Sequence, residues 1–166
     1  MIFLTVGTVF PFDRLVRAVD QAIADGLITE PVLAQIGDTE LKPDNMEYAR
    51  MLSKDDFKRN MAESEYLISH AGIGSIVTAL ELNKRMIVMP RLKRLAEHVN
   101  DHQVGTAHKF EDLGHVLAVY DVSELRAKIK EIASFKPKPR QANPEPMIQR
   151  VSEFLTQMCG DKKQAF

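Results

Sequence analysis

Residues 65–89 read EYLISHAGIGSIVTALELNKRMIVM, and this stretch decides the fold class. Its first five residues form a short, mostly apolar run that fits a buried strand, and residues 86–89 form a second such run. Between them, apolar residues recur at helical spacing over residues 76–82. A strand, a helix and another strand in this order predict a parallel βαβ unit with a right-handed crossover.

The same alternation continues on both sides of this unit. The remaining predicted strands lie at residues 2–6, 31–36 and 116–120, and the remaining predicted helices of the alternation lie at 12–26, 54–64, 101–113 and 123–134. Ser53, with Asp56 three residues later, resembles a capping box at the start of the second of these helices. Since strand and helix exchange about five times, the sequence predicts an α/β fold, a Rossmann-like doubly wound parallel sheet.

The length and the distribution of prolines predict one compact domain with a C-terminal extension. The chain has 166 residues, which fits one domain and is short for two. We expect the α/β domain over residues 1–134 and a proline-rich linker over 135–146, where residues 136–146 contain four prolines. A C-terminal helix and tail follow over 147–166, with the amphipathic part at 147–158, and are expected to dock on the domain or on a partner.

Composition excludes several classes of function. Lys and Arg number 22 against 23 Asp and Glu, so there is no basic excess for binding nucleic acid. The single cysteine, Cys159, excludes an internal disulfide framework. The N-terminus lacks the pattern of a secretory signal, and no apolar run reaches the roughly 20 residues of a membrane-spanning helix. A cytoplasmic protein is expected, with any membrane role peripheral or provided by a partner.

Ligands of doubly wound sheets bind beyond the carboxyl ends of the strands, so the loops that follow the strands carry the candidate sites. In the loop at residues 7–11, Gly7 allows a close turn and Thr8 offers a hydroxyl. The loop at residues 69–75, Ser-His-Ala-Gly-Ile-Gly-Ser, places two glycines where a helix begins and its first amides are unpaired. Such a helix start can hold a diphosphate without a metal.

The spacing of this second loop leaves two interpretations open. It fits a diphosphate site, and it fits equally a tight strand-to-helix turn with Ser75 as the N-cap. A dinucleotide-binding fingerprint is excluded because Val77 stands where the third glycine would be. The loop also does not fit the nucleophile elbow of a hydrolase.

A third loop, residues 90–103, is dense in hydrogen-bonding groups. Asn100, Asp101, His102 and Gln103 lie at a predicted helix start and suit sugar hydroxyls. The basic side chains of this loop suit a phosphate or an anionic sugar, or form an ordinary solvated loop; they are Arg91, Lys93 and Arg94. Although His70, His98 and His102 are suitable ligand types, no H-E-x-x-H glutamate or cysteine cluster accompanies them, so no metal is expected.

Three segments carry a resemblance to a known family. Residues 1–11, with Val6-Gly7-Thr8, residues 69–75 and the run Glu-His-Val-Asn-Asp-His-Gln at 97–103 together resemble the C-terminal, donor-binding domain of the glycosyltransferase 28 family. The likeness covers residues 1 to about 134. Within the family it extends to small catalytic subunits of bacterial exopolysaccharide glycosyltransferases, and to the catalytic subunit of the eukaryotic two-component transferase that adds the second GlcNAc to dolichol-linked sugar.

This resemblance implies one half of a GT-B enzyme. It implies inverting transfer of a sugar from a UDP-sugar to a lipid-linked acceptor in exopolysaccharide synthesis, with no metal cofactor and with a uronic acid as the expected donor sugar. The missing half would be a membrane-associated, acceptor-binding subunit that brings the general base and is gripped by the C-terminal helix. The chain would then lie at the inner face of the membrane through this partner.

The resemblance also assigns roles to individual residues. The diphosphate-binding set is Gly7, Thr8, Ala71, Gly72, Gly74 and Ser75. His70 is a candidate catalytic residue that donates to a phosphate or orients the turn, and Gln103 matches the donor-sugar glutamine. One departure is Thr78, which stands where many relatives carry a ribose-binding glutamate; the nearest acid is Glu81. The alternative functions are a non-catalytic nucleotide-sugar sensor or scaffold and, more weakly, a nucleotide-sugar epimerase or hydrolase.

Overall fold

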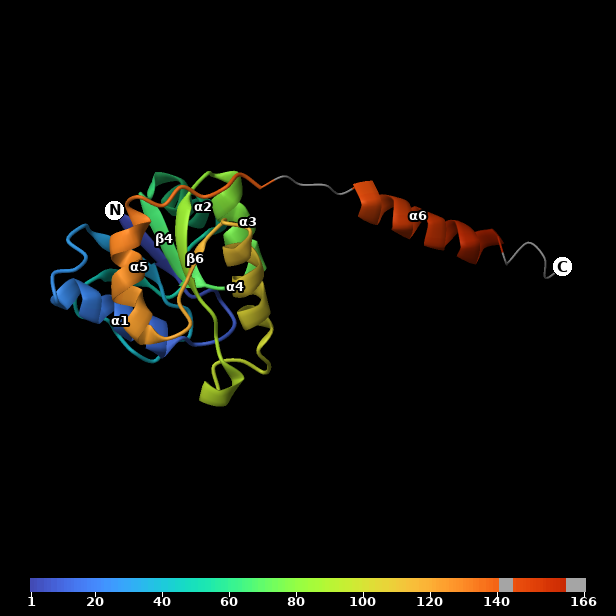
Figure 1. Ribbon diagram of the computed structural model, residues 1–166. Helices are drawn as coiled ribbons and strands as arrows, with labels where there is room; N and C mark the ends of the chain where they lie inside the picture. Colours follow the sequence, from blue (N-terminus) through green and yellow to red (C-terminus); the bar gives the residue numbers. More distant parts are fainter. Residues whose placement is uncertain (141–144, 161–166) are drawn as a thin grey trace.

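The computed structural model, which describes residues 1–140 and 145–160, contains a six-stranded parallel sheet with helices on both faces (Figure 1). The strands are β1 (Ile2–Thr5), β2 (Val32–Gln35), β3 (Glu47–Ala49), β4 (Tyr66–His70), β5 (Arg85–Met89) and β6 (Leu117–Ala118). Their order in the sheet is β3-β2-β1-β4-β5-β6. The predicted Rossmann-like, doubly wound sheet is confirmed, and its strand order reverses direction between β1 and β4.

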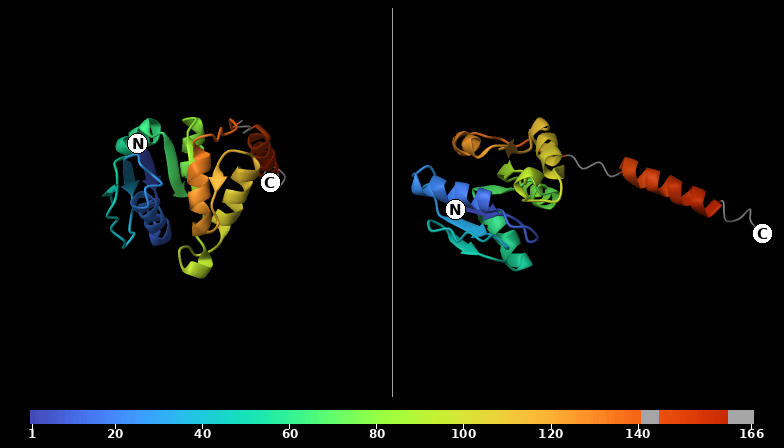
Figure 2. Two further views of the ribbon diagram at one scale, coloured as in Figure 1. Left: turned by 60° about the vertical axis from the view of Figure 1, so that its left-hand side comes forward. Right: turned by 90° about the horizontal axis from the view of Figure 1, so that it is seen from below.

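Five helices cover the two faces of the sheet (Figures 1 and 2). Helices α1 (Asp13–Ala24) and α5 (Leu125–Ile132) pack on one face, and α2 (Lys54–Glu63), α3 (Ile73–Glu81) and α4 (His102–Asp112) pack on the other. Alternate residues of β1 serve both faces, because Ile2 and Leu4 join the core under α1 and α5 whereas Phe3 joins the core under α2, α3 and α4. This two-sided burial explains why the central strand β1 is almost entirely apolar.

Three elements of the structure were absent from the sequence predictions, namely one strand and two 3₁₀ turns. The edge strand β3 was not predicted, because residues 47–49 are largely exposed and carry no apolar pattern. The predicted helix at 123–134 is divided into a 3₁₀ turn, η2 (Val122–Glu124), and α5, since the side chains of Asp121 and Glu124 form a capping box around η2. A second 3₁₀ turn, η1 (Lys93–Leu95), lies in the predicted 90–103 loop. By contrast, Ser53 caps α2 as expected, its Oγ accepting from the Asp56 N–H at 3.0 Å.

The segment that follows α5 is attached to the α/β domain through Lys138. The Lys138 N–H donates to the Gly114 carbonyl at 2.8 Å, and the Lys138 carbonyl lies 2.8 Å from Nδ1 of His115. Helix α6 (Glu145–Gly160) begins before the predicted residue 147, and every side chain of residues 145–158 is exposed. Residues 141–144 of the predicted linker and 161–166 of the predicted tail lie outside the described residues. No helix of the described chain has the length and apolar content needed to cross a bilayer.

Candidate functional site

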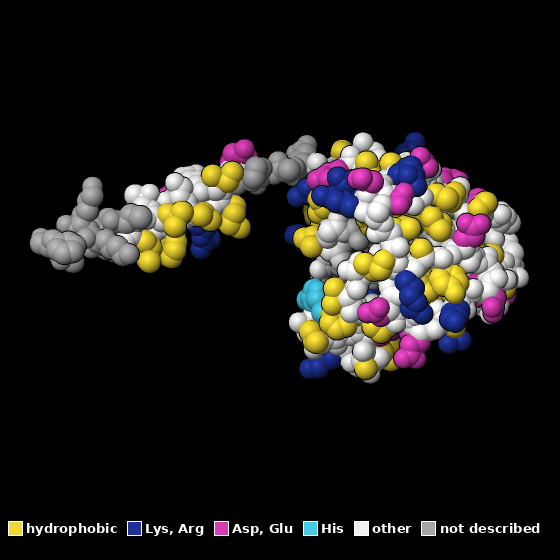
Figure 3. Space-filling model, turned by 180° about the vertical axis from the view of Figure 1, so that it is seen from behind, with side chains coloured by type: hydrophobic (Ala, Val, Ile, Leu, Met, Phe, Trp, Pro, Cys, Tyr) yellow, Lys and Arg dark blue, Asp and Glu magenta, His cyan; other side chains and the backbone are white. Residues whose placement is uncertain are grey.

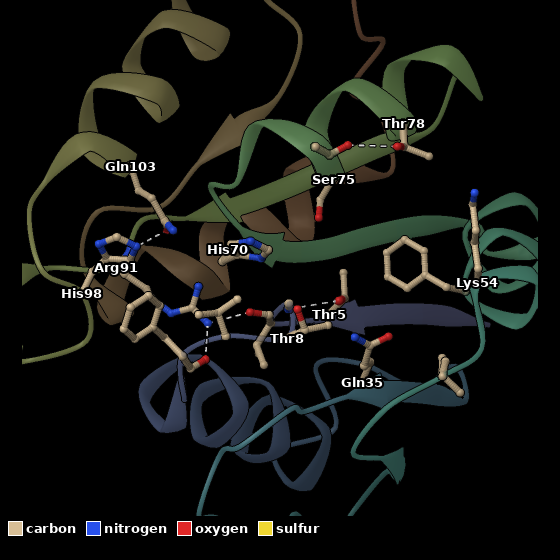
Figure 4. A pocket seen from close by; sticks show the side chains of 17 residues that line it. Thr5, Thr8, Gln35, Lys54, His70, Ser75, Thr78, Arg91, His98 and Gln103 are labelled. Carbon is tan, nitrogen blue, oxygen red and sulfur yellow. Dashed lines mark hydrogen bonds between the residues drawn. The ribbon is translucent and has the colours of Figure 1, made fainter.

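A cavity of about 670 Å³ opens at the carboxyl end of the sheet, where the strand order reverses (Figure 4). Its walls come from the loop after β1, the end of β2, the start of α2, the β4–α3 connection, and the segment from β5 into α4. Ligands of open parallel sheets bind at this reversal point, since the loops on either side of it lead away in opposite directions. The topology therefore brings together all three loops that the sequence analysis selected.

The first turn of α3 faces this cavity with unpaired amides. The helix begins at Ile73, and its N-cap, Gly72, provides no side-chain hydrogen bond. Among the described residues, the N–H groups of Ile73, Gly74 and Ser75 have no acceptor, and the first bond of the helix runs from the Ile76 N–H to the Gly72 carbonyl at 3.2 Å. The alternative in which Ser75 is the N-cap is therefore wrong. Gly74 and Ser75 line the cavity, so the positive end of the helix is open to an anionic ligand.

The imidazole of His70 packs against the backbone at the start of α3. Its ring lies so close to two backbone segments that a Cβ on Gly72 would be 2.2 Å from Nε2 and a Cβ on Gly7 would be 3.0 Å from Cε1. Only glycine fits at Gly72 without displacement of the ring. Glycine is also favoured at Gly7 by its positive φ of 79°. His70 thus lies between the loop after β1 and the β4–α3 connection.

The hydrogen bonds of Ser69 determine the tautomer of His70. The Ser69 hydroxyl donates its one proton to the Thr5 carbonyl at 2.9 Å, and the same oxygen lies 3.1 Å from Nδ1 of His70. Nδ1 must therefore carry the proton and donate it, which leaves Nε2 as an acceptor. Burial, assisted by the positive charge of Arg91, lowers the pKa of His70 to about 4. At neutral pH the ring is uncharged and Nε2 cannot donate to a phosphate, so the structure supports the orienting role for His70.

Arg91 holds the loop after β1 in place. This residue is 3% exposed, and its guanidinium donates to the carbonyls of Val6 and Phe10 at 2.6 Å and of Pro11 at 3.3 Å. It also lies over the ring of Phe12, 4.9 Å from the centroid. Burial lowers the pKa of Arg91 to about 10, which leaves it charged at neutral pH. Arg91 lines the cavity as predicted, but most of its donors bind main-chain carbonyls and fix the position of Gly7 and Thr8.

Gln103 occupies the α4 side of the cavity. It is 4% exposed, and its Oε1 accepts from the Arg91 N–H at 3.1 Å. This contact leaves Nε2 as the free donor of the amide in a residue that lines the cavity. His98 lines the cavity next to it, between the rings of Phe10 at 4.7 Å and His102 at 4.6 Å. One amide donor and one imidazole are therefore available at this end to hydroxyl groups of a sugar.

The charge of the cavity suits an anion. None of the 17 residues around it is acidic, whereas Lys54 and Arg91 are basic. Within residues 1–140 and 145–160, no group of three or more His, Cys, Asp or Glu side chains is placed to hold a metal ion. The amides of α3 and the two basic side chains are thus the groups that can balance a negative ligand here.

Not every predicted residue reaches the cavity. Those that line it are Gly7, Thr8, His70, Gly74, Ser75, Arg91 and Gln103. Ala71 is 1% exposed and packs in the core instead. The remaining predicted residues lie outside the lining set: Gly72, Lys93, Arg94, Asn100, Asp101 and His102. Asp101 has a structural contact, since its Oδ1 accepts from the Lys93 N–H at 2.8 Å.

Of the ten lining residues that were not predicted, four belong to parts of the chain that the sequence analysis did not connect with the site, namely Gln35, Leu52, Lys54 and Phe57. Gln35 ends β2, Leu52 lies in the connection from β3 to α2, and Lys54 and Phe57 lie in the first turn of α2. The rule that ligands bind at strand ends could have selected Gln35, because it is a polar residue at the end of an apolar run. The other three were not found because only the pairing of β3 with β2 brings Leu52 and the start of α2 to the cavity.

Comparisons with known proteins agree with this architecture. Over 54 residues the chain is 44% identical to the UDP-N-acetylglucosamine transferase subunit ALG13 of Candida glabrata, covering 32% of this chain and 25% of that protein. Over 124 residues it is 28% identical to human ALG13, covering 69% of this chain and 10% of that protein. The aligned region is thus a quarter or less of the length of these curated relatives.

Solved structures share the fold. The glycosyltransferase of kitacinnamycin superimposes with a TM-score of 0.60 at 21% identity, covering 80% of this chain and 34% of that one. The solution structure of ALG13 superimposes with a TM-score of 0.57 at 23% identity, covering 90% of this chain and 93% of that one. MurG of Acinetobacter baumannii superimposes with a TM-score of 0.56 at 16% identity, covering 79% of this chain and 40% of that one. The fold of this chain is therefore shared with part of each of two of these structures and with nearly all of the third. Because the model of the glycosyltransferase family 28 C-terminal domain matches residues 1–158, this chain belongs to that family.

Proposed function

We propose that this chain is the donor-binding catalytic subunit of an inverting, UDP-sugar-dependent hexosyltransferase that acts together with a partner subunit. The observation that carries the proposal is the set of unpaired α3 amides open to a cavity without acidic side chains. The family and the relatives named as UDP-N-acetylglucosamine transferase subunits support the nucleotide-sugar chemistry.

The diphosphate of the donor would lie between the first turn of α3 and the loop at Gly7 and Thr8. As the bond to the sugar breaks, negative charge grows on the departing UDP, and amides already aimed at it stabilise that charge without reorganisation. The hydrogen bonds of Arg91 to the Val6 and Phe10 carbonyls, together with the His70 ring, set the positions of the loop after β1 and of the start of α3 before the ligand binds. No metal takes part in this proposal, because amides and basic side chains supply the positive potential.

The sugar would lie on the α4 side, where Gln103 offers its Nε2 and His98 its ring. The acceptor hydroxyl must lose a proton as it attacks the anomeric carbon. No carboxylate lines the cavity, and burial lowers the pKa of both imidazoles that do, His70 and His98, which makes them weaker proton acceptors. We therefore assign the general base to the partner subunit.

The partner would also bring the acceptor. The chain covers 34% of the glycosyltransferase of kitacinnamycin and 40% of MurG, which fits one of the two halves of a GT-B enzyme. Apolar side chains gather along the exposed α6 (Figure 3), namely Met147, Ile148, Val151, Phe154, Leu155 and Met158. Their spacing makes one helical stripe. We propose that this stripe binds a membrane-associated, acceptor-binding subunit, which places the chain at the cytoplasmic face of a membrane, and that the acceptor is lipid-linked in exopolysaccharide synthesis.

The test combines binding with reconstituted transfer. We expect the purified chain to bind UDP in calorimetry but to transfer little sugar alone. Membranes from cells that lack the gene should restore transfer from labelled UDP-sugars, including a UDP-uronic acid, into a lipid-extractable product. The control variant Phe154→Asp should bind UDP equally well and fail to be rescued.

The outcomes separate the competing functions. Full activity of the isolated chain would contradict the need for a partner. UDP binding without transfer under any of these conditions would favour a nucleotide-sugar sensor. If UDP failed to bind the wild-type chain at millimolar concentration, the donor-site assignment itself would be wrong.

A further inference from the structure

Gln35, at the end of β2, is a buried amide without hydrogen bonds. It is 3% exposed and lines the cavity, yet its Oε1 has no hydrogen-bond partner among the described residues. No hydrogen bond within that part of the chain involves its Nε2. Gln103 is as buried, at 4% exposed, but its Oε1 accepts from the Arg91 N–H. Since buried polar groups in native proteins are almost always paired, an unpaired amide in a cavity wall points to a ligand contact.

The position of Gln35 defines which part of a ligand it can reach. It is the register partner of Thr5 in β1, and so it lies on the side of the Gly7 loop away from β4. Figure 4 shows Gln35 and Lys54 on one side of His70, and Gln103 and His98 on the other. With the diphosphate at the α3 amides in the middle and the sugar at Gln103, the remaining part of a nucleotide-sugar must extend toward Gln35.

The surroundings of Gln35 fit a nucleoside. Leu52 follows β3, which pairs with β2 next to Gln35, and Phe57 lies in the first turn of α2 with Lys54. Both line the cavity and offer apolar surface on which a flat base can pack. The amide adds one acceptor and one donor, which match the edge of a base or a ribose hydroxyl. The Oγ1 of Thr78 donates its proton to the Gly74 carbonyl at 2.9 Å, so Thr78 offers a ligand an acceptor only, whereas Gln35 offers both a donor and an acceptor.

We propose that Gln35 hydrogen-bonds the nucleoside of the bound donor, and that Gln35, Leu52 and Phe57 form the nucleoside end of the cavity. This inference rests on the proposed function, since it assumes a nucleotide-sugar ligand. It also gives the amide a distinctive signature. Replacing an unpaired buried amide with an apolar side chain of similar size removes no hydrogen bond of the free protein. The thermal stability should therefore be kept or raised while nucleotide affinity falls.

The experiment uses the full chain as wild type, Gln35→Leu and Gln35→Met, titrated with UDP and with inorganic pyrophosphate. Pyrophosphate probes the α3 amides alone, and UDP adds the nucleoside. We expect both variants to bind UDP about fivefold to tenfold more weakly than the wild type and to bind pyrophosphate equally well. The control Asn60→Leu removes another buried amide, one that donates to the Asp56 carbonyl outside the cavity, and should leave both affinities unchanged.

Several results would overturn the inference while the proposed function stands. They are unchanged UDP affinity in both Gln35 variants, equal losses for UDP and pyrophosphate, or a fall in melting temperature in both variants, which would show that the amide serves folding. A wild-type chain that binds pyrophosphate as tightly as UDP would also overturn it. Failure of the wild type to bind either compound would overturn the inference and the proposed function together.

Discussion

Gly72→Ala tests the arrangement of the diphosphate site most directly. Gly72 has φ −80° and ψ 128°, a conformation open to any residue, so a methyl group there acts through space alone. Its Cβ would lie 2.2 Å from Nε2 of His70, whereas ordinary contacts begin at 3.4 Å, so the ring or the start of α3 must move by about 1 Å. The ring cannot retreat freely, because Nδ1 is bonded to Ser69.

The expected size of the effect follows from this clash. Overpacking of this kind costs about 1–3 kcal/mol, which corresponds to a fall of about 3–9 °C in melting temperature. Displacement of the α3 amides that loses one hydrogen bond to a phosphate costs about 1.5–3 kcal/mol, or about 10- to 100-fold in affinity for UDP. Differential scanning calorimetry and isothermal titration of UDP measure the two effects.

Gly105→Ala is the matched control. Gly105 lies in α4 outside the cavity, and a Cβ there would meet nothing within 4 Å. This variant should gain about 0.5–1 kcal/mol of stability from the better helix propensity of alanine and keep the UDP affinity of the wild type. If Gly72→Ala matched Gly105→Ala in both measurements, the His70 ring would not restrict this turn and the account of the site would be refuted.

Three further predictions address other parts of the molecule. Because burial and the charge of Arg91 lower the pKa of His70 from 6.5 to about 4, the unfolded chain takes up a proton that the folded chain refuses, and stability should fall as the pH drops through this window. Between pH 7 and pH 5, the free energy of unfolding measured with urea should decrease by about 2 kcal/mol less in His70→Gln than in the wild type. Equal decreases in the two proteins would contradict the lowered pKa of His70. Arg91→Met should lower the unfolding free energy by about 3 kcal/mol, since it leaves the Val6 and Phe10 carbonyls unpaired, and should weaken UDP binding; an unchanged urea midpoint would argue against the clamp. Deletion of residues 145–166 should leave the melting temperature of the α/β domain within about 1 °C, because no described side chain of α6 is buried. A large drop in that measurement would show that α6 packs on its own domain.

The sequence by itself determined the fold class and several of the residues that line the cavity. The apolar runs at 2–6 and 65–69 fit buried strands, and the helical spacing after Gly74 indicated the βαβ order. These signals are local, because the periodicity of each element and the glycines at its end are written in neighbouring residues. Gly7, Thr8, Gly74 and Ser75 were found for this reason, as was Gln103 through its family motif.

The tertiary structure decided which side chains line the cavity and which hold the surrounding loops in place. Arg91 and His70 had looked like anion contacts. In the fold, the Arg91 guanidinium donates to three carbonyls of a loop 80 to 85 residues earlier in the chain. The His70 ring is neutral and lies between Gly7 and Gly72. Gln35 and Phe57 were missed because they reach the cavity only through strand pairing with β1 and through the short edge strand β3. Such roles depend on burial and on partners distant in the sequence, and local patterns carry no information about either.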